Sequence, residues 1–392
     1  MKPLRIGIDV SRTALELSGI GHYVRNLVES LSRVNDERHS FVLYGAFFEC
    51  APDRWKNAYV PKNKGFKLHQ RHLRGAMIRD RWRHLKAPPD KLIGDVDVIH
   101  STAFVMPPVE TVPSVVHIHD LSCIVHPEYH DFTNIDLVVR NILKAARQAS
   151  LILTLSEKSK FDILRYLHVE EDLVRVVGAA ASSRFFKKVT VEDRSRIRKH
   201  YNINNPYFLF VSSLEPRKNP IRLLQAYRLF LESVGEDIDL VFAGPKGWKN
   251  EDVHRTIHSL GLNANVKFIG YVTEEDLPAL YQEALAFVYP SLYEGFGMPI
   301  LEAMGSGTPV ITSRIPPLTE VAGGAALLAD PLNVHELAEA MCAMAESGRL
   351  REALIEKGRR RASQFNWDDI ARRTLSAYEE AAERWPSGGD RH

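Results

Sequence analysis

The sequence predicts an α/β protein with two doubly wound, Rossmann-like domains that face each other across a cleft. Short apolar runs rich in Val, Ile, Leu and Phe recur along its 392 residues, with longer amphipathic segments between them. Most of these runs are apolar at consecutive positions, which is typical of parallel strands that helices cover on both faces. The length is sufficient for two domains of ordinary size.

Six apolar runs in each half of the chain are predicted to be strands. In the first half they are residues 4–10, 40–45, 96–101, 114–120, 151–156 and 174–180. In the second half they are residues 207–214, 238–244, 265–272, 284–291, 309–313 and 325–330. Amphipathic segments such as 219–234 and 333–347 are predicted to be helices, and this alternation of strand and helix indicates repeated crossover connections.

The domain boundary is expected in the polar, turn-rich segment 201–207. This places an N-terminal domain at 1–203 and a C-terminal domain at 204–366. The last amphipathic segment begins at 367, and we expect it to pack back on the N-terminal domain, with a frayed tail ending at 392.

Composition excludes several classes of protein. The 51 Lys and Arg nearly balance the 49 Asp and Glu, which gives no reason to expect nucleic acid as a partner. Cys50, Cys123 and Cys342 are odd in number and far apart, which argues against a disulfide framework or a cysteine metal cluster and favours a reducing cytoplasm. The N-terminal apolar run is short and interrupted by Arg5 and Asp9, so we expect neither a signal peptide nor a membrane-spanning helix.

Ligands of open parallel sheets bind beyond the carboxyl ends of the strands, so residues that directly follow strands have the greatest weight. The first such stretch, SGIGHYVRNL, contains Gly19 and Gly21 at the start of a predicted helix. The free N–H groups of a helix N-terminus favour an anion. A glycine turn without a ligand is an equally good interpretation, because the third glycine of the dinucleotide fingerprint is absent.

The second stretch, VVHIHD, ends in His119 and Asp120. His117 and His119 share one face if the strand continues that far, but two histidines without a third ligand are weak evidence for a metal. His119 is the better candidate for the cleft. The alternative is a strand-end histidine that is hydrogen-bonded to a backbone carbonyl.

The third stretch, SSLEPRKNP, places Arg217 and Lys218 at the turn into a helix. Basic side chains oppose the dipole at this end of a helix unless an anion lies among them, so they indicate phosphate. A solvated turn is the alternative.

The fourth stretch is YEGFGMPILEAMGSGTPV. Pro299 suits the first turn of a helix, and Gly305 or Gly307 suits its end. Glu294 then lies in the loop after a strand, and Glu302 lies about one turn into a short helix. Such carboxylates can accept hydrogen bonds from the hydroxyl groups of a sugar and of a ribose.

Two Asp-x-Asp pairs, at 95–97 and 237–239, match the pattern that holds a divalent ion in one class of sugar transferases. There the apolar strand precedes the pair, whereas here it follows. We therefore interpret both pairs as strand-entry residues and expect no essential metal.

Taken together, EPRKN, YPSLYEGFGMPILEAMGSGTPVITS, GIG before a helix and HD after a strand resemble the family 4 retaining glycosyltransferases of the GT-B fold. The resemblance covers nearly the whole chain. VHIHDLSCIVHPEYH and SSLEPRKNP are most similar to the bacterial mannosyltransferase branch, whose members build surface polysaccharides on lipid carriers.

The resemblance implies a role for each matching position. It implies catalytic roles for His119, Lys218 and Glu294, beside the transferred sugar and its diphosphate. It implies donor contacts for Gly19, Arg217, Lys218, Tyr271, Val272, Glu294, Gly295, Phe296, Gly297 and Glu302, with Glu302 on the ribose and positions 271 and 272 at the base. Ser212 and Ser213 stand where many members carry an arginine, so the phosphate charge must be met by positions 217 and 218 and a helix end.

The implied reaction is transfer of mannose from GDP-mannose to a hydroxyl of a polyprenyl-diphosphate-linked saccharide, with retention and without a cofactor. The N-terminal domain would bind the acceptor and the C-terminal domain the nucleotide sugar. A UDP-sugar donor, a sugar-nucleotide epimerase, a phosphorylase and a non-catalytic nucleotide-sugar binding protein are the alternatives. A phosphorylase would need a longer chain and a lysine for pyridoxal phosphate.

A basic segment at 62–91 holds ten Lys or Arg against two Asp, with apolar residues between them. Such a segment can lie on the anionic inner face of a membrane or bind the diphosphate of a lipid-linked acceptor. The candidates for this contact are Arg74, Arg79, Arg81, Trp82, Arg83 and Lys86. A solvated helix at the edge of the first domain is the alternative. The expected location is cytoplasmic, peripheral on the inner face of the cell membrane.

Overall fold

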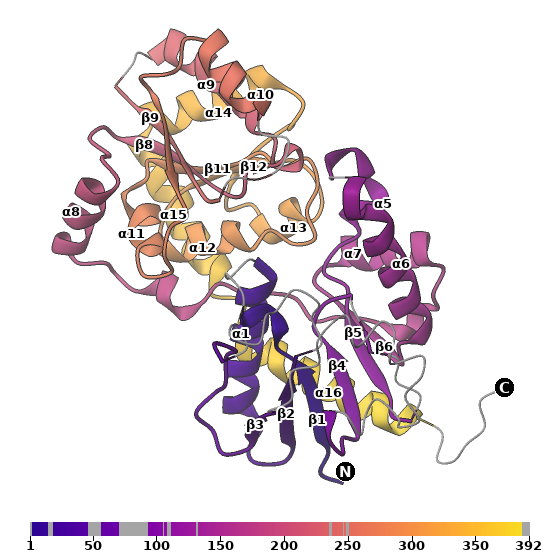
Figure 1. Ribbon diagram of the computed structural model, residues 1–392. Helices are drawn as coiled ribbons and strands as arrows, with labels where there is room; N and C mark the ends of the chain where they lie inside the picture. The colour runs from indigo at the N-terminus through magenta and orange to yellow at the C-terminus, as the bar shows by residue number, and fades with distance from the viewer. Residues whose placement is uncertain are drawn as a thin grey trace. The chain divides into compact units, whose positions relative to one another are not determined.

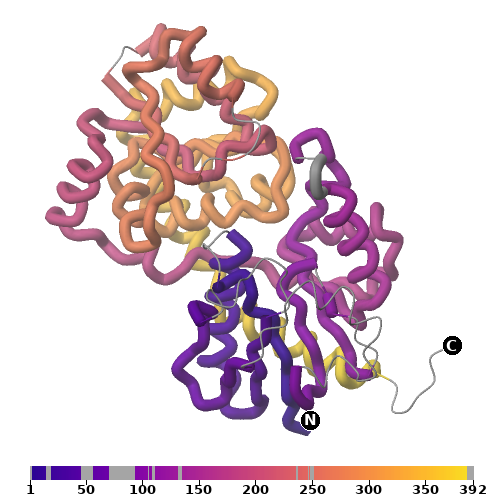
Figure 2. Tube along the Cα trace, in the orientation of Figure 1, coloured from indigo at the N-terminus to yellow at the C-terminus, as the bar shows by residue number. Residues whose placement is uncertain are grey.

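The computed structural model describes residues 2–14, 19–45, 56–69, 93–104, 106–107, 111–130, 132–234, 237–245, 247 and 251–385. The chain divides into two compact units, each with a parallel sheet (Figures 1 and 2). The first unit comprises Met1–Ile124, Thr133–Ala179 and Trp367–His392, and the second comprises Val125–Phe132 and Ala180–Asn366.

The sheet of the first unit has seven parallel strands in the order β3-β2-β1-β4-β5-β6-β7. They are β1 (Arg5–Asp9), β2 (Ser40–Tyr44), β3 (Phe66–Leu68), β4 (Val98–Ser101), β5 (Ser114–His117), β6 (Leu151–Thr154) and β7 (Val174–Val176). The strands β4, β5 and β6 are buried along their whole length, which explains their unbroken apolar sequences.

Helices alternate with these strands along the chain, and most of them lie on the faces of the sheet (Figure 1). They are α1 (Gly19–Val34), α5 (Ser122–Val125), α6 (Phe132–Gln148), α7 (Glu157–Leu167) and α16 (Trp367–Arg384), with short 3-10 helices at Ser11–Thr13 and Glu171–Leu173. The last helix, α16, packs against α1, β4, β5 and β6. The C-terminal segment therefore belongs to the first unit.

The sheet of the second unit has six parallel strands in the order β10-β9-β8-β11-β12-β13. They are β8 (Tyr207–Val211), β9 (Asp239–Ala243), β10 (Val266–Gly270), β11 (Ala286–Tyr289), β12 (Val310–Ser313) and β13 (Leu327–Ala329). The core on one face contains aromatic pairs such as Phe208 with Phe230 and Phe210 with Phe242.

The helices of the second unit alternate with these strands. They are α8 (Val191–His200), α9 (Pro220–Val234), α10 (Glu251–Ser259), α11 (Leu277–Glu283), α12 (Met298–Ser306), α13 (Leu318–Ala322), α14 (Val334–Glu346) and α15 (Gly348–Ala362), with 3-10 helices at Pro127–Tyr129, Ser183–Phe186 and Pro216–Lys218. The pair α9 and α14 packs on one side of the sheet, and α15 packs against α12.

Both sheets reverse their winding at their first strand. In the first unit β1 lies between β2 and β4, and in the second unit β8 lies between β9 and β11. The loops after β8 and β11 therefore diverge at the carboxyl edge of the sheet, which is where open α/β sheets bind ligands.

All twelve predicted strands are present, several of them shorter than expected. The sequence analysis missed β3, a three-residue edge strand inside the basic segment. The expected domain boundary after residue 203 lies inside the second unit, which begins again at Ala180. The reason is α8, which packs on α11 and forms ion pairs from Arg194 and Arg198 to Glu283.

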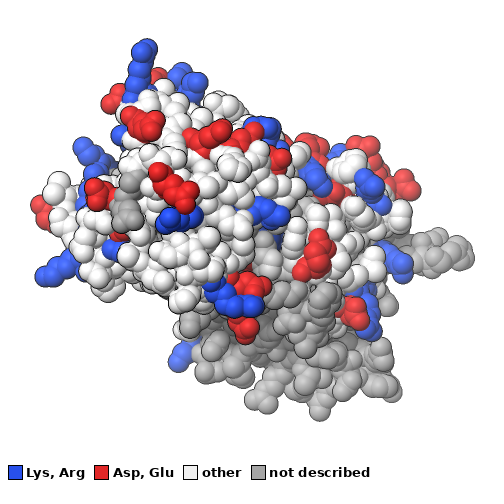
Figure 3. Space-filling model, turned by 90° about the horizontal axis from the view of Figure 1, so that it is seen from above, with Lys and Arg blue, Asp and Glu red and all other residues white. Residues whose placement is uncertain are grey.

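Charged side chains of both signs are interspersed over the described part of the face shown in Figure 3. Among the helices of the described ranges, none combines the length and the apolar character needed to cross a bilayer.

Candidate active site

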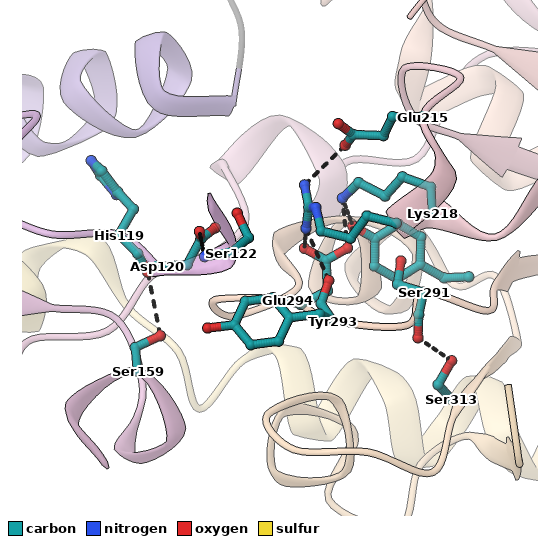
Figure 4. A network of polar contacts seen from close by, with 12 residues as sticks. His119, Asp120, Ser122, Ser159, Glu215, Lys218, Ser291, Tyr293, Glu294 and Ser313 are labelled. Carbon is teal, nitrogen blue, oxygen red and sulfur yellow. Dashed lines mark hydrogen bonds and ion pairs between the residues drawn. The ribbon is translucent and has the colours of Figure 1, made fainter. Parts of the chain in front are cut away.

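A buried cluster of charged side chains lies at the carboxyl ends of β8 and β11 (Figure 4). Lys218 Nζ donates to Glu294 Oε1 at 2.6 Å and to the hydroxyl of Tyr289 at 2.7 Å. The Tyr289 hydroxyl donates to the same carboxylate oxygen at 2.7 Å. Arg217 Nη1 donates to Glu294 Oε2 at 2.9 Å, and Arg217 Nη2 donates to Glu215 Oε1 at 2.9 Å. Two cations and two carboxylates thus neutralise one another in the interior.

The fold brings these residues together by joining the two loops. The backbone N–H of Leu292 donates to the carbonyl of Arg217 at 2.8 Å, and Arg217 Nη1 donates to the carbonyl of Tyr293 at 2.9 Å. The side chain of Asn219 donates to the carbonyls of Pro290 and Pro331, so it fixes the start of α9 to the loops after β11 and β13. Residues that are 76 positions apart therefore meet because β8 and β11 are neighbours in the sheet.

Burial and charge act in opposite directions on Glu294. Burial raises the pKa of its carboxyl, but the charges of Arg217 and Lys218, with hydrogen bonds from Lys218 and Tyr289, outweigh burial and lower that pKa to about 2. Burial and the neighbouring Arg217 lower the pKa of Lys218, against the opposing attraction of Glu294 and Glu215. Glu294 is therefore an anion throughout the physiological range, held by fixed donors.

The helix α12 begins next to this cluster in the chain. Gly297, at its N-terminal cap, has a φ of 104°, and a Cβ there would lie 2.6 Å from the side chain of Leu318, so only glycine fits. Gly307 ends the helix with a φ of 81°. The predicted helix between Pro299 and the glycines is thus confirmed. The first turn of α12, which follows the loop of Glu294 in the chain, has backbone N–H groups without an acceptor inside the helix.

Glu302 lies on α12, and the hydroxyl of Tyr281 donates to its Oε2 at 3.3 Å. Glu294 and Glu302 therefore have different hydrogen-bond partners, since Glu294 accepts from Lys218, Arg217 and Tyr289 and Glu302 accepts from Tyr281. Phe296 is buried, and its ring packs edge-on against that of Phe365. The expected donor contact of this loop, which also contains Gly295, would therefore be made by its backbone.

The expected base-binding residues directly follow β10. Tyr271 is 54% exposed and Val272 is 9% exposed. Gly270 precedes them with a φ of 72°, which turns the chain at the end of the strand.

In the first unit, His119 lies two residues beyond the end of β5. Its Nε2 donates to the carbonyl of Thr102 at 2.8 Å, the backbone bond that the sequence analysis gave as the alternative to a ligand contact. This bond fixes the tautomer and leaves Nδ1 as an acceptor. Burial lowers the pKa of His119, with Arg12 acting in the same direction against Thr102 and Asp120, so the ring is neutral at pH 7. Its ring stacks on that of His117 with centroids 5.1 Å apart, which confirms that the two share a face.

Gly19 is the first residue of α1, and a Cβ at this position would meet no atom within 4 Å. Steric crowding in the described structure therefore gives no reason for a glycine here. Asp120 accepts a hydrogen bond from the backbone of Ser122 at 2.8 Å and so fixes the turn into α5 (Figure 4).

A second buried polar network, which the sequence analysis did not predict, lies behind His119. Tyr378 on α16 contacts His100 Nδ1 at 2.7 Å, His100 Nε2 contacts His117 Nδ1 at 3.0 Å, and His117 Nε2 contacts Tyr23 at 3.1 Å. The Tyr23 hydroxyl donates to the carbonyl of Gly178 at 3.2 Å.

The terminal carbonyl determines the direction of every bond in this network. A carbonyl only accepts, so Tyr23 donates its proton there and must accept from His117 Nε2. His117 Nδ1 then accepts from His100 Nε2, and His100 Nδ1 accepts from Tyr378. Both histidines are neutral, in agreement with burial, which lowers the pKa of His100 to about 3 and that of His117 also well below its usual value.

Tyr289, Glu215 and Asn219 are site residues that sequence reasoning missed. Tyr289 ends an apolar strand and gave no polar signal, whereas Glu215 and Asn219 flank the basic pair in EPRKN and could have been found there. The ring of His126, a residue of the second unit, also packs edge-on against Tyr293 at 5.3 Å.

The strand-entry interpretation of the Asp-x-Asp pairs is confirmed for two residues. Asp97 accepts a hydrogen bond from the backbone of Arg5 at 2.7 Å, and Asp239 pairs with Lys267 at 2.8 Å. Within the described ranges, no three His, Cys, Asp or Glu side chains are grouped so that they could hold a metal ion. The candidates for acceptor or membrane contact, Arg74, Arg79, Arg81, Trp82, Arg83 and Lys86, lie outside the described residues.

Similarity to known proteins shows the family of the chain. Residues 193–361 match the family model described as "Glycosyl transferases group 1". The chain is 31% identical over 366 residues to the O-antigen chain mannosyltransferase B of Escherichia coli, covering 92% of this chain and 96% of that protein. It is 33% identical over 246 residues to the MMP alpha-(1->4)-mannosyltransferase of Mycolicibacterium hassiacum, covering 62% of this chain and 56% of that protein.

Solved structures share the fold. Anabaena HepE, in complex with UDP and glucose, has a TM-score of 0.73 and 20% identity, with 96% of this chain and 100% of that chain covered. WaaG, a glycosyltransferase involved in lipopolysaccharide biosynthesis, has a TM-score of 0.70 and 17% identity, with 96% and 99% covered. The two Rossmann-like halves are thus those of GT-B glycosyltransferases. From its full-length relative and its family match, the chain belongs to the group 1 glycosyltransferases and is a glycosyltransferase.

Proposed function

We propose that this enzyme transfers mannose from GDP-mannose, with retention of configuration, to a hydroxyl of a polyprenyl-diphosphate-linked saccharide during polysaccharide assembly. The observation that carries the proposal is the buried cluster of Lys218, Arg217 and Glu294 at the switch point of the second sheet. The choice of mannose rests on the relatives, since a protein named as an O-antigen chain mannosyltransferase matches nearly the full chain.

Charge explains how this cluster would bind a nucleotide sugar. Its two cations are balanced by Glu215 and Glu294, so the unliganded site carries no net charge. A diphosphate brings negative charge that competes with Glu294 for Lys218 and Arg217. The ammonium of Lys218 uses two of its three N–H donors on Tyr289 and Glu294, which leaves one for a phosphate oxygen. The start of α12 adds backbone donors.

Glu294 would receive the sugar. Its Oε1 accepts from both Lys218 and Tyr289, and its Oε2 accepts from Arg217, so one acceptor direction of Oε2 remains for a sugar hydroxyl. Glu302 would bind the ribose, and Tyr271 with Val272 would hold the base. His119, through Nδ1, would accept a hydrogen bond from the transferred sugar.

The proposed reaction exchanges one bond at the anomeric carbon for another. The bond from this carbon to the phosphate oxygen breaks, and a bond to the acceptor oxygen forms on the same face. The proton of the acceptor hydroxyl passes to the departing phosphate oxygen, so the side chains supply no nucleophile. Fixed cations stabilise the charge that develops on the diphosphate, which is typically the largest contribution in such sites. This chemistry requires no resident cofactor or metal.

The basic segment would bring the enzyme to its acceptor at the inner membrane face. Neutralising Arg79, Arg81, Arg83 and Lys86 is expected to weaken sedimentation with anionic liposomes, because each basic residue near such a surface is worth about 1 kcal/mol. Unchanged sedimentation would remove the membrane contact from the proposal without affecting the donor site.

The donor and the transfer are tested by one assay. The purified protein is incubated with GDP-mannose, GDP-glucose, UDP-glucose and UDP-N-acetylglucosamine, each with and without lipid extract, and the released diphosphate is quantified. The expected result is release of GDP from GDP-mannose that depends on the lipid extract, with an α-linked product. Consumption without extract would indicate an epimerase or a hydrolase, and release of UDP alone would contradict the donor.

A further inference from the structure

A cavity of about 410 Å³ lies in the second unit, and none of the residues of the Lys218–Glu294 cluster lines it. Its walls come from the segment after the 3-10 helix Ser183–Phe186 and from α8, α11, α12 and α15. The lining residues are Phe186, Lys187, Lys188, Arg194, Gln282, Gly305, Ser306, Gly307 and Arg359. The lining therefore contains four basic side chains and no acidic one. The volume is within the range of small-molecule pockets and exceeds that of a single phosphate.

Two glycines at the end of α12 leave room for the side chains that form this cavity. A Cβ at Gly305 would lie 3.2 Å from the ring of Phe186. At Gly307 it would overlap the guanidinium of Arg359, and the φ of 81° also favours glycine there. The ring of Phe186 and the guanidinium of Arg359 therefore lie directly against the end of α12. They contact Gly305 and Gly307, the two neighbours of Ser306 in the sequence.

The simplest explanation of Arg359 is that it caps the carboxyl end of α12, and a neighbour on the same helix shows what such a cap looks like. Arg361 lies against Gly323 at the end of α13 and donates to the carbonyls of Val321 and Glu320. Arg359 lies against Gly307 in the same way, but it donates to no carbonyl and forms no ion pair within the described part of the chain. Arg359 is exposed, and none of its donors is used by the residues that the structure describes.

Ser306 provides an independent indication of a ligand. The residue is 3% exposed, it lines the cavity, and its hydroxyl has no hydrogen-bond partner among the described residues. Buried hydroxyls without a partner are rare in folded proteins, because each costs about 1–3 kcal/mol of desolvation.

The Gln282 side chain fixes the backbone that carries two of the remaining cations. Gln282 accepts from the backbone of Val189 at 3.0 Å and donates to the carbonyl of Lys187 at 2.7 Å, which fixes the segment that carries Lys187 and Lys188. Gln282 also accepts from Arg194 at 3.3 Å. Neither Lys187 nor Lys188 forms an ion pair within the described ranges, whereas Arg194 pairs with Glu283.

We propose that this cavity binds a small phosphate-bearing anion, at a site separate from the Lys218–Glu294 cluster. Arg359, Lys187 and Lys188 would supply charge that no described carboxylate neutralises, and the hydroxyl of Ser306 would donate to a phosphate oxygen. Charge-assisted hydrogen bonds of this kind favour a multiply charged anion over chloride. The site does not depend on which sugar the enzyme transfers.

The test is calorimetric titration with inorganic pyrophosphate at constant ionic strength, without divalent ions. The key variant is Arg359→Gln, and the matched control is Arg360→Gln. Arg360 is the next position on α15, is exposed like Arg359 and carries the same charge, but it does not line the cavity. Arg359→Gln is expected to weaken binding about tenfold, while Arg360→Gln leaves it unchanged. Equal affinities in these two variants, or no saturable binding to the wild type, would overturn the proposal.

Two further variants separate this site from the active site and from effects on folding. Lys218→Ala is expected to bind pyrophosphate as the wild type does, with the same dependence on Arg359. Loss of pyrophosphate binding in Lys218→Ala would show that the anion occupies the active site instead. Ser306→Ala is expected to fold with a thermal stability equal to or above that of the wild type, because it removes a buried hydroxyl that has no described partner, and to bind pyrophosphate several-fold more weakly. Wild-type affinity in Ser306→Ala would contradict the assignment.

Discussion

The two buried polar networks of this enzyme are built on opposite principles. In the second unit, Lys218, Arg217, Glu294 and Glu215 are all charged, and every bond between them is one that a charged ligand can replace. In the first unit, His100 and His117 are neutral, and one backbone carbonyl dictates every proton position. Ion pairs can be exchanged for bonds to a charged ligand, whereas no histidine of the neutral network can change its tautomer without breaking a hydrogen bond. We infer that the charged network of the second unit rearranges when the donor binds, and that the neutral network of the first unit supports His119.

The largest expected effect tests the exchangeable network. Glu294→Ala removes the carboxylate that accepts from Lys218, Tyr289 and Arg217, and it is expected to lower turnover by about a hundredfold or more. Turnover of the purified variant is measured under saturating donor. Glu232→Ala is the matched control, because Glu232 is an exposed residue of α9 whose partner is the partly exposed Arg228. A rate for Glu294→Ala within threefold of that control would contradict the assignment.

The stability of the charged cluster should depend on pH. Glu294→Gln leaves two buried cations with one carboxylate, so we expect its free energy of unfolding to fall by about 3 kcal/mol at pH 7. The native pKa of Glu294 lies below its unfolded value, so its contribution is present above pH 4.5 and is lost as the pH falls towards 2. The difference between wild type and variant should therefore narrow by about 1 kcal/mol at pH 3.5. Urea unfolding of both proteins at pH 7 and pH 3.5 measures this difference in the free energy of unfolding. The same difference at both pH values would show that Glu294 has an ordinary pKa.

Substitutions in the neutral network should lower the stability of the protein without a comparable loss of activity. Tyr23→Phe leaves His117 Nε2 without an acceptor and is expected to cost about 2 kcal/mol in the free energy of unfolding, whereas Tyr378→Phe leaves only an acceptor unpaired and is expected to cost about 1 kcal/mol. Turnover of Tyr378→Phe should remain within about threefold of wild type. A hundredfold loss of turnover in Tyr378→Phe would show that this network takes part in the reaction, and it would contradict the contrast between the charged and the neutral network.

The smallest effect is spectroscopic. Nitrogen NMR of the wild type is expected to show His100 and His117 both with a proton on Nε2 and none on Nδ1, between pH 6 and 8. A proton on Nδ1 of either ring would show that the carbonyl of Gly178 does not determine the direction of the hydrogen bonds in this network.

The sequence predicted the strands and the positions of several site residues because buried parallel strands leave unbroken apolar runs. It did not predict that Glu294 pairs with Lys218, because that contact depends on β8 and β11 being neighbours, and strand order leaves no periodic signal. Tyr289 was missed because a tyrosine that ends an apolar strand resembles core. The edge strand β3 was missed because three residues are too few to show a pattern. His119 illustrates a mixed outcome, since one ring nitrogen has the structural role given as the alternative and the other remains for a ligand.

The central claim, that the cation at the switch point of the second sheet stabilises a departing diphosphate, is tested most directly by a matched pair of variants. Lys218→Ala removes the buried ammonium, and Arg228→Ala removes a partly exposed cation from α9, the helix that follows Lys218. Release of nucleoside diphosphate is measured under saturating donor and acceptor. The account predicts a loss of about a hundredfold or more in Lys218→Ala and a change of less than twofold in Arg228→Ala. Near-equal rates in the two variants would contradict it.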